Sequence, residues 1–248
     1  GYVKAIISND STEDNEIIMY PVTVAEGVFF EDGESLADKI SGISIGGGVS
    51  QNTSVIPNKW LNKNIFCFGY SITQGGYPAY IGTTLGAFIF NKGSNGSNYT
   101  RDWDIINSTD LTYADAVTFM TGHNDGARNV TLETSGLLDI EDVYNFDSYP
   151  GNYYGALGKL INYVRKNYPK VKIYLLGLHY TTRENKSKDC QRALKEIGEY
   201  YSVPFIDVYA NCGISKTNLN VYSEDGTHLN DEGNRLLGEC IAYQMMYK

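Results

Sequence analysis

Short apolar runs alternate with longer segments of helical periodicity from about residue 59 to the end of the chain. The runs are rich in β-branched and aromatic residues, as expected of strands: Ile65–Phe68, Phe88–Phe90, Ala114–Met120, Val171–Leu176 and Pro204–Val208. The helical segments carry apolar residues on one face: Pro78–Leu85, Asn152–Tyr168, Ser187–Tyr201 and Asp231–Met246. Such alternation predicts a three-layer α/β/α sandwich around a central parallel five-stranded sheet.

Residues 1–57 lack this alternation and are expected to form an N-terminal extension to a main domain at 58–248. They contain a candidate strand at Val3–Ile7, a candidate short helix at Ser35–Ile40 and a glycine-rich stretch at Gly42–Gly48. A segment of this size has too small a core to be stable alone. We therefore expect it to pack on the main domain or on copies of itself, as an attachment or oligomerisation segment.

Composition excludes several classes of protein. The net charge of −9 and the lack of a basic stripe argue against a nucleic-acid partner. No apolar run approaches the roughly 20 residues of a membrane span, and no signal peptide is evident, so the location of the protein stays open. The four cysteines, at positions 67, 190, 212 and 240, show neither zinc nor disulfide spacing. We expect them to be reduced and structural, and we expect no metal.

A serine lies just beyond the first predicted strand of the main domain. Ser71 follows Gly69, which permits a tight turn, at the edge where open α/β sheets carry their sites. An ordinary turn or helix N-cap serine would look the same. His228 strengthens the catalytic interpretation, because it is the only histidine with a carboxylate, Asp225, three residues before it. The three residues suit a nucleophile, a general base and the acid that orients the base.

Donors for a developing oxyanion are available on neighbouring loops. The backbone N–H at Ser71, the N–H of Gly96 and the side-chain amide of Asn124 follow the first three predicted strands. Because the carboxyl ends of parallel strands open on one edge, we expect these groups to converge there.

Four short blocks in this order resemble the SGNH (GDSL-type) hydrolases, which have a flavodoxin-like sandwich fold. The blocks are Gly69–Thr73, Gly96, Gly122–Asp125 and Asp225–His228, and the resemblance spans about residues 60–248. It implies that Ser71 is the nucleophile, His228 the base and Asp225 its partner. It also implies an oxyanion hole formed by Ser71, Gly96 and Asn124. The family is typically metal-free and cleaves esters, and many of its members remove acetyl groups from carbohydrates.

One position departs from the family pattern. Tyr70 stands where the family usually has an aspartate before the serine. Tyr70 and Tyr77 are candidates for lining the substrate pocket, as are His123 and His179. We expect Asp125 to brace its loop rather than to act as a second acid.

A second, shorter resemblance lies in the N-terminal extension. Tyr20–Thr23 followed by Asp32–Leu36 is similar to attachment segments of phage tail-fibre and baseplate proteins. This resemblance implies a location on a phage particle, or a secreted or cell-surface location on a bacterium, and a homotrimer.

The main hypothesis is a serine esterase that hydrolyses short-chain esters through an acyl-enzyme. The expected substrate is a small acyl ester or an O-acetylated glycan, because the 21 tyrosines suit contact with sugars and no lipid-binding stretch is present. One alternative is a glycan-binding tail-fibre or adhesin module with a vestigial hydrolase site. Another is a lipase or lysophospholipase, which would need a wide apolar slot.

Overall fold

The computed structural model describes residues 3–7, 15–19, 58–125, 137, 140–182 and 184–248. Contacts divide the chain into two units, Gly1–Asn58 and Lys59–Lys248. In the first unit, β1 (Val3–Ile7) pairs antiparallel with β2 (Asn15–Met19). The predicted strand at Val3–Ile7 is confirmed, whereas β2 was not predicted because its first residues continue an acidic, loop-like stretch.

Two expectations for the N-terminal extension lie outside the described residues. These are the short helix at Ser35–Ile40 and the glycine-rich stretch at Gly42–Gly48. The packing of the extension on the main domain or on other copies of the chain stays a prediction.

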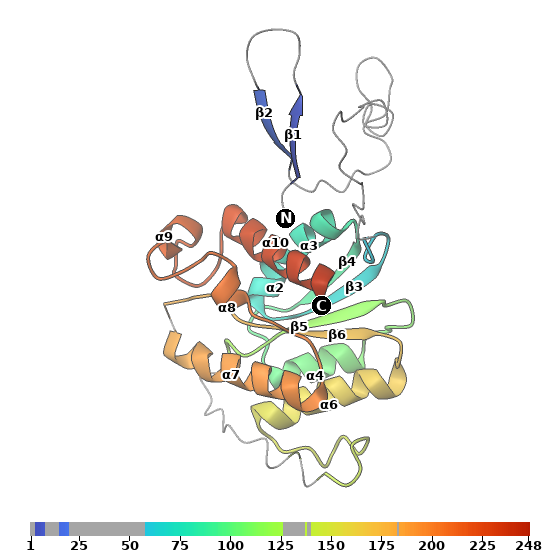
Figure 1. Cartoon of the computed structure of the whole chain (residues 1–248). Coiled ribbons are helices and arrows are strands. Elements are labelled where there is room, and N and C mark those ends of the chain that lie inside the picture. Colours follow the sequence, from blue (N-terminus) through green and yellow to red (C-terminus); the bar gives the residue numbers. More distant parts are fainter. Residues whose placement is uncertain (1–2, 8–14, 20–57, 126–136, 138–139, 183) are drawn as a thin grey trace. The chain divides into compact units, whose positions relative to one another are not determined.

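The second unit contains a parallel sheet of five strands in the order β4-β3-β5-β6-β7 (Figure 1). The strands are β3 (Asn64–Gly69), β4 (Phe88–Gly93), β5 (Ala116–Met120), β6 (Lys172–Leu176) and β7 (Phe205–Ile206). Every residue of β5, and every residue of β3 after Asn64, is buried. Such continuous apolar runs are characteristic of central strands covered on both faces. The predicted α/β/α sandwich is confirmed.

Helices form the two outer layers of the sandwich. They are α2 (Ser71–Gly75), α3 (Tyr77–Leu85), α4 (Tyr99–Asn107), α6 (Tyr153–Asn167), α7 (Glu184–Tyr201), α8 (Val208–Asn211), α9 (Leu219–Tyr222) and α10 (Asp231–Tyr247). Figure 1 shows α3 and α10 side by side on one face of the sheet and α4, α6 and α7 on the other. No helix in the described ranges is both long enough and apolar enough to cross a membrane.

Helix α4 is the main element of this unit that the hydrophobic pattern did not predict. Its residues are mostly polar, and the two that are buried are Asp102 and Ile106. Tyr99, Trp103 and Ile106 do lie at helical spacing, but Tyr99 and Trp103 are only partly buried, and polar and acidic residues between them obscure the pattern in the sequence. The burial of Asp102 becomes important for the site described below.

Gly93 allows the short helix α2, which begins at Ser71, to pack directly against the end of β4. A Cβ atom at Gly93 would lie 2.2 Å from the backbone nitrogen of Gln74 and 2.7 Å from the carbonyl carbon of Thr73. Both atoms belong to the backbone of α2, so they cannot move aside as a flexible side chain would. The glycine therefore sets how closely α2 approaches the sheet.

We expect Gly93→Ala to lower the free energy of unfolding by roughly 1–3 kcal/mol, the usual cost of overpacking a close contact. Urea unfolding followed by tryptophan fluorescence measures this, because Trp60 and Trp103 both lie in this unit. Gly75→Ala is the matched control, since a Cβ at Gly75 meets nothing within 4 Å. Equal stability of the two variants would contradict the packing argument.

Candidate active site

Ser71 begins helix α2, immediately beyond the carboxyl end of the central strand β3. β3 pairs with β4 on one side and with β5 on the other, so the loops that follow three adjacent strands surround the serine. Gly69 ends β3, and the backbone N–H of Ser94 donates to its carbonyl oxygen at 2.9 Å. The fold thus places Ser71 where parallel sheets carry their sites.

Ser71, His228 and Asp225 form a continuous chain of hydrogen bonds. The Nε2 atom of His228 lies 3.0 Å from the Oγ atom of Ser71, and its Nδ1 atom lies 2.6 Å from Oδ2 of Asp225. A carboxylate accepts hydrogen bonds, so Nδ1 carries the proton and Nε2 is left to accept one from the serine hydroxyl. The predicted nucleophile, base and orienting acid are therefore within hydrogen-bonding distance of one another.

The turn at residues 225–228 holds the Asp225 carboxylate in place. Its Oδ1 atom accepts hydrogen bonds from the backbone N–H groups of Thr227 and His228, at 2.9 and 2.7 Å. Hydrogen bonding from the His228 side chain, and then from these backbone groups, keeps the pKa of Asp225 well below its ordinary value. The carboxylate consequently stays ionised at neutral pH and can stabilise an imidazolium.

The loop after β6 supports this turn from the inside of the protein. His179 is fully buried, and its Nε2 atom lies 3.0 Å from the carbonyl oxygen of Thr227. Burial lowers the pKa of His179 to about 4, so the ring is neutral at physiological pH and donates its Nε2 hydrogen to that carbonyl. Thr182 donates through its backbone N–H to Gly226 O at 2.9 Å. These contacts make His179 a support of the turn rather than a residue at an open surface.

The predicted oxyanion donors lie on the loops after β4 and β5. Asn124 donates one Nδ2 hydrogen to the carbonyl oxygen of Ser97 at 2.8 Å, which leaves the second hydrogen available. Gly96 adopts a left-handed conformation with φ of 70°, and a Cβ there would meet nothing within 4 Å. The roles of Ser71, Gly96 and Asn124 in an oxyanion hole remain predictions.

The candidate pocket residues Tyr70, Tyr77 and His123 lie inside the protein. Tyr70 and Tyr77 are 1% and 0% exposed, and His123 is 7% exposed. The rings of Tyr70 and His123 stack with centroids 5.5 Å apart, and the Tyr77 hydroxyl lies 3.2 Å from the Thr73 hydroxyl. Their burial argues against direct contact with a substrate. The physical reason is that aromatic rings beside a central strand complete the core beneath the serine turn.

Two buried carboxylates behind the site were not singled out as a pair by sequence analysis. Asp102 and Asp125 are 3% and 1% exposed. The Oδ1 atom of Asp125 accepts a hydrogen bond from the Tyr99 backbone N–H at 2.9 Å, in keeping with the expected loop brace. Burial raises the pKa of Asp102 to about 6. Nothing in the sequence distinguishes Asp102 from the exposed Asp104 of the same helix.

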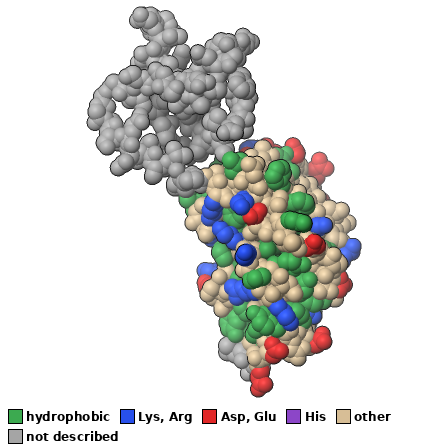
Figure 2. Space-filling view, turned by 90° about the vertical axis from the view of Figure 1, so that its right-hand side faces the viewer, with side chains coloured by type: hydrophobic (Ala, Val, Ile, Leu, Met, Phe, Trp, Pro, Cys, Tyr) green, Lys and Arg blue, Asp and Glu red, His purple; other side chains and the backbone are tan. Residues whose placement is uncertain are grey.

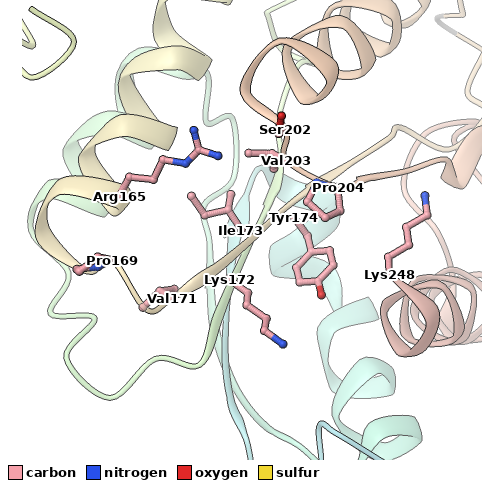
Figure 3. Close-up of a pocket in the computed structure, with 10 residues that line it drawn as sticks. All are labelled: Arg165, Pro169, Val171, Lys172, Ile173, Tyr174, Ser202, Val203, Pro204 and Lys248. Carbon is pink, nitrogen blue, oxygen red and sulfur yellow. The ribbon is translucent and has the colours of Figure 1, made fainter. Parts of the chain in front are cut away.

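A cavity of about 260 Å³ lies away from this site, near the amino ends of β6 and β7 (Figure 3). Its lining includes Val171 and Lys172 at the amino end of β6 and residues 202–204 before β7. The charged heads of Arg165, Lys172 and Lys248 point in different directions in Figure 3. Figure 2 shows Lys and Arg side chains among hydrophobic and acidic ones on the right-hand side of Figure 1. The cavity has no convergent set of groups for catalysis.

The main domain combines a parallel α/β/α sandwich with a serine, a histidine and an aspartate within hydrogen-bonding distance of one another. The chain belongs to the GDSL-like lipase/acylhydrolase family, whose sequence profile matches residues 67–236. This family implies ester hydrolase activity. No curated protein is significantly similar to the chain in sequence.

Solved structures share the fold at low sequence identity. A lipase/acylhydrolase from Enterococcus faecalis is 19% identical, with a TM-score of 0.56 over 75% of this chain and 96% of that chain. A catalytic mutant of an acetylxylan esterase from Geobacillus stearothermophilus is 20% identical, with a TM-score of 0.55 over 75% and 95%. A protein from Lactobacillus plantarum is 19% identical, with a TM-score of 0.59 over 75% and 97%.

Proposed function

We propose that the protein is a serine esterase that removes short acyl groups, with O-acetyl groups on carbohydrate as its substrate class. The observation that carries this proposal is the hydrogen-bonded chain from Ser71 through His228 to Asp225, with distances of 3.0 and 2.6 Å. Such a chain is the arrangement that activates a hydroxyl for attack on a carbonyl carbon.

The reaction proceeds in two halves. His228 Nε2 takes the proton of Ser71 Oγ as this oxygen attacks the ester carbonyl carbon, and the developing oxyanion accepts hydrogen bonds from Gly96, Asn124 and the Ser71 backbone. The ester C–O bond then breaks, and the alcohol leaves with the proton from His228. A water molecule, deprotonated by His228, then attacks the acyl carbon; the bond to Ser71 Oγ breaks, His228 returns its proton to that oxygen, and the carboxylic acid leaves.

Similar solved structures support the proposed chemistry and substrate class. The acetylxylan esterase structures include catalytic mutants in which a serine, a histidine or an aspartate is changed to alanine. The aspartate and the histidine are three residues apart there, as Asp225 and His228 are here. The connected hydrogen bonds favour an active esterase over a glycan-binding module with a vestigial site. Phage association and a trimer remain expectations from the N-terminal resemblance.

A panel of esters tests the proposal. We expect the full chain to hydrolyse p-nitrophenyl acetate and butyrate, to release acetate from acetylated xylo-oligosaccharides, and to act at least about 100-fold more slowly on p-nitrophenyl palmitate. A preference for palmitate would replace the proposed substrate class with that of a lipase. The absence of turnover on every ester would overturn the esterase and favour the binding module.

A further inference from the structure

The amide of Asn124 is oriented by a neighbour that is itself anchored. Ser97 is 1% exposed, and its carbonyl oxygen accepts one Nδ2 hydrogen of Asn124 at 2.8 Å. The two hydrogens of an amide nitrogen lie in one plane at a fixed angle, so this bond determines where the second hydrogen points. The position of the Ser97 carbonyl therefore sets the direction in which Asn124 can donate to a substrate.

Asp102 anchors Ser97 from inside the protein. The Ser97 hydroxyl donates to Oδ1 of Asp102 at 2.5 Å, and the Ser97 backbone N–H donates to Ser94 O at 3.0 Å. Asp102 lies in the first turn of α4 and is 3% exposed. Helix α4 is thus hydrogen-bonded to the loop after β4 through this buried carboxylate.

Asp125 links the first residue of α4, which follows the loop after β4, to the end of β5. It follows Asn124 directly, and its Oδ1 atom accepts the Tyr99 backbone N–H at 2.9 Å. Its Oδ2 atom lies 3.4 Å from the Thr121 hydroxyl. The loops that carry Gly96 and Asn124 are consequently joined through two buried carboxylates.

We propose that Asp102 is a positioning residue for the oxyanion hole, acting through Ser97 on the amide of Asn124. The inference rests on the proposed esterase function, because it assigns Asn124 to that hole. Asp102 does not touch the reacting atoms. It holds the hydroxyl of Ser97, and the carbonyl of Ser97 in turn orients the amide of Asn124. A displacement of the donor by about 1 Å can lower an enzyme's rate on the order of 100-fold.

The electrostatics of Asp102 allow this role to be separated from a structural one. Burial and, to a smaller extent, nearby Asp125 raise its pKa, the Ser97 and Thr121 hydroxyls and Arg101 oppose the rise, and the net result is a pKa of about 6. Tyr153 also lies near enough to interact with it. A carboxyl with a raised pKa favours the protonated folded state, so its contribution to stability falls as pH rises from about 4 through about 6. At pH 8 the ionised Asp102 should therefore disfavour folding.

Asp102→Asn tests the proposal because it keeps the shape and replaces the charged acceptor of the Ser97 hydroxyl with a weaker, neutral one. We expect kcat for p-nitrophenyl acetate to fall about tenfold or more, with KM changed less than twofold and the thermal midpoint at pH 8 unchanged or raised. Asp104→Asn, the same change at an exposed position of the same helix, should leave kcat within twofold. A residue that only stabilised the fold would lower the thermal midpoint when replaced.

A double-mutant cycle with Asn124→Ala identifies the route of the effect. If Asp102 acts through Asn124, Asp102→Asn should slow the Asn124→Ala variant less than twofold, because the positioned group is already absent. A full additional tenfold loss in that background would overturn the proposal. So would wild-type kcat in Asp102→Asn alone.

A spectroscopic measurement separates failure of this inference from failure of the proposed function. The side-chain NH₂ signals of Asn124, assigned through Asn124→Ala, should shift or broaden in Asp102→Asn and stay unchanged in Asp104→Asn. Unchanged signals in Asp102→Asn would refute the link to Asn124 even in an active enzyme. Shifted signals in a protein with no turnover would support the link and refute the esterase instead.

Discussion

Replacing Ser71 with alanine is expected to lower kcat for p-nitrophenyl acetate by about 10⁴–10⁶-fold. The reason is that His228 Nε2 lies 3.0 Å from the Ser71 hydroxyl, and no acyl-enzyme can form once this oxygen is absent. The residual rate should be that of water attacking an ester held by the remaining donors. Steady-state hydrolysis at saturating ester measures the change.

Ser108→Ala is the matched control for this prediction. Ser108 is an exposed serine at the end of α4, and its hydroxyl donates to backbone carbonyl oxygens. The control variant should keep kcat within twofold. Turnover in Ser71→Ala above about a tenth of the wild-type rate would assign the activity to another group.

Replacing His228 with alanine is the second change with a very large expected effect. Without the imidazole, nothing within the hydrogen-bonded chain can take the proton from Ser71, and kcat should fall by about 10⁴–10⁶-fold. The falls in kcat of the two single variants should not add, because the serine and the histidine act as one unit. Ser71→Ala/His228→Ala should therefore be no more than about tenfold slower than either single variant.

The rate and the stability of His228→Ala together distinguish a catalytic triad from a contact without function. The His228 and Asp225 side chains are 56% and 54% exposed, so the contact between them contributes little to stability. His228→Ala should accordingly keep the thermal midpoint within a few degrees. A His228→Ala variant with near wild-type turnover would show that the base lies elsewhere.

The central strands β3 and β5 could be predicted from the sequence because their burial is mostly apolar. Both strands are covered on both faces, so their residues form hydrophobic runs that stand out in the chain, broken within β5 only by Thr118. The pairing of Asp225 with His228 was predictable because both lie in one turn, where local geometry brings the carboxylate and the ring together.

The parts that could not be predicted depend on contacts distant in sequence. Helix α4 buries Asp102, and a buried acid looks like a surface residue in a hydrophobic pattern. Its hydrogen bond to Ser97 becomes apparent only once α4 is packed against the sheet. Tyr70 and Tyr77 were expected to line the pocket because Tyr70 precedes Ser71 in the sequence, whereas their rings are buried in the core.

The most direct measurement of the central claim is mass spectrometry of the full chain after reaction with a small fluorophosphonate. We expect one covalent adduct, mapped by peptide analysis to Ser71, formed far more slowly in His228→Ala and absent in Ser71→Ala. An unlabelled wild-type protein, or an adduct on a different residue, would contradict the claim.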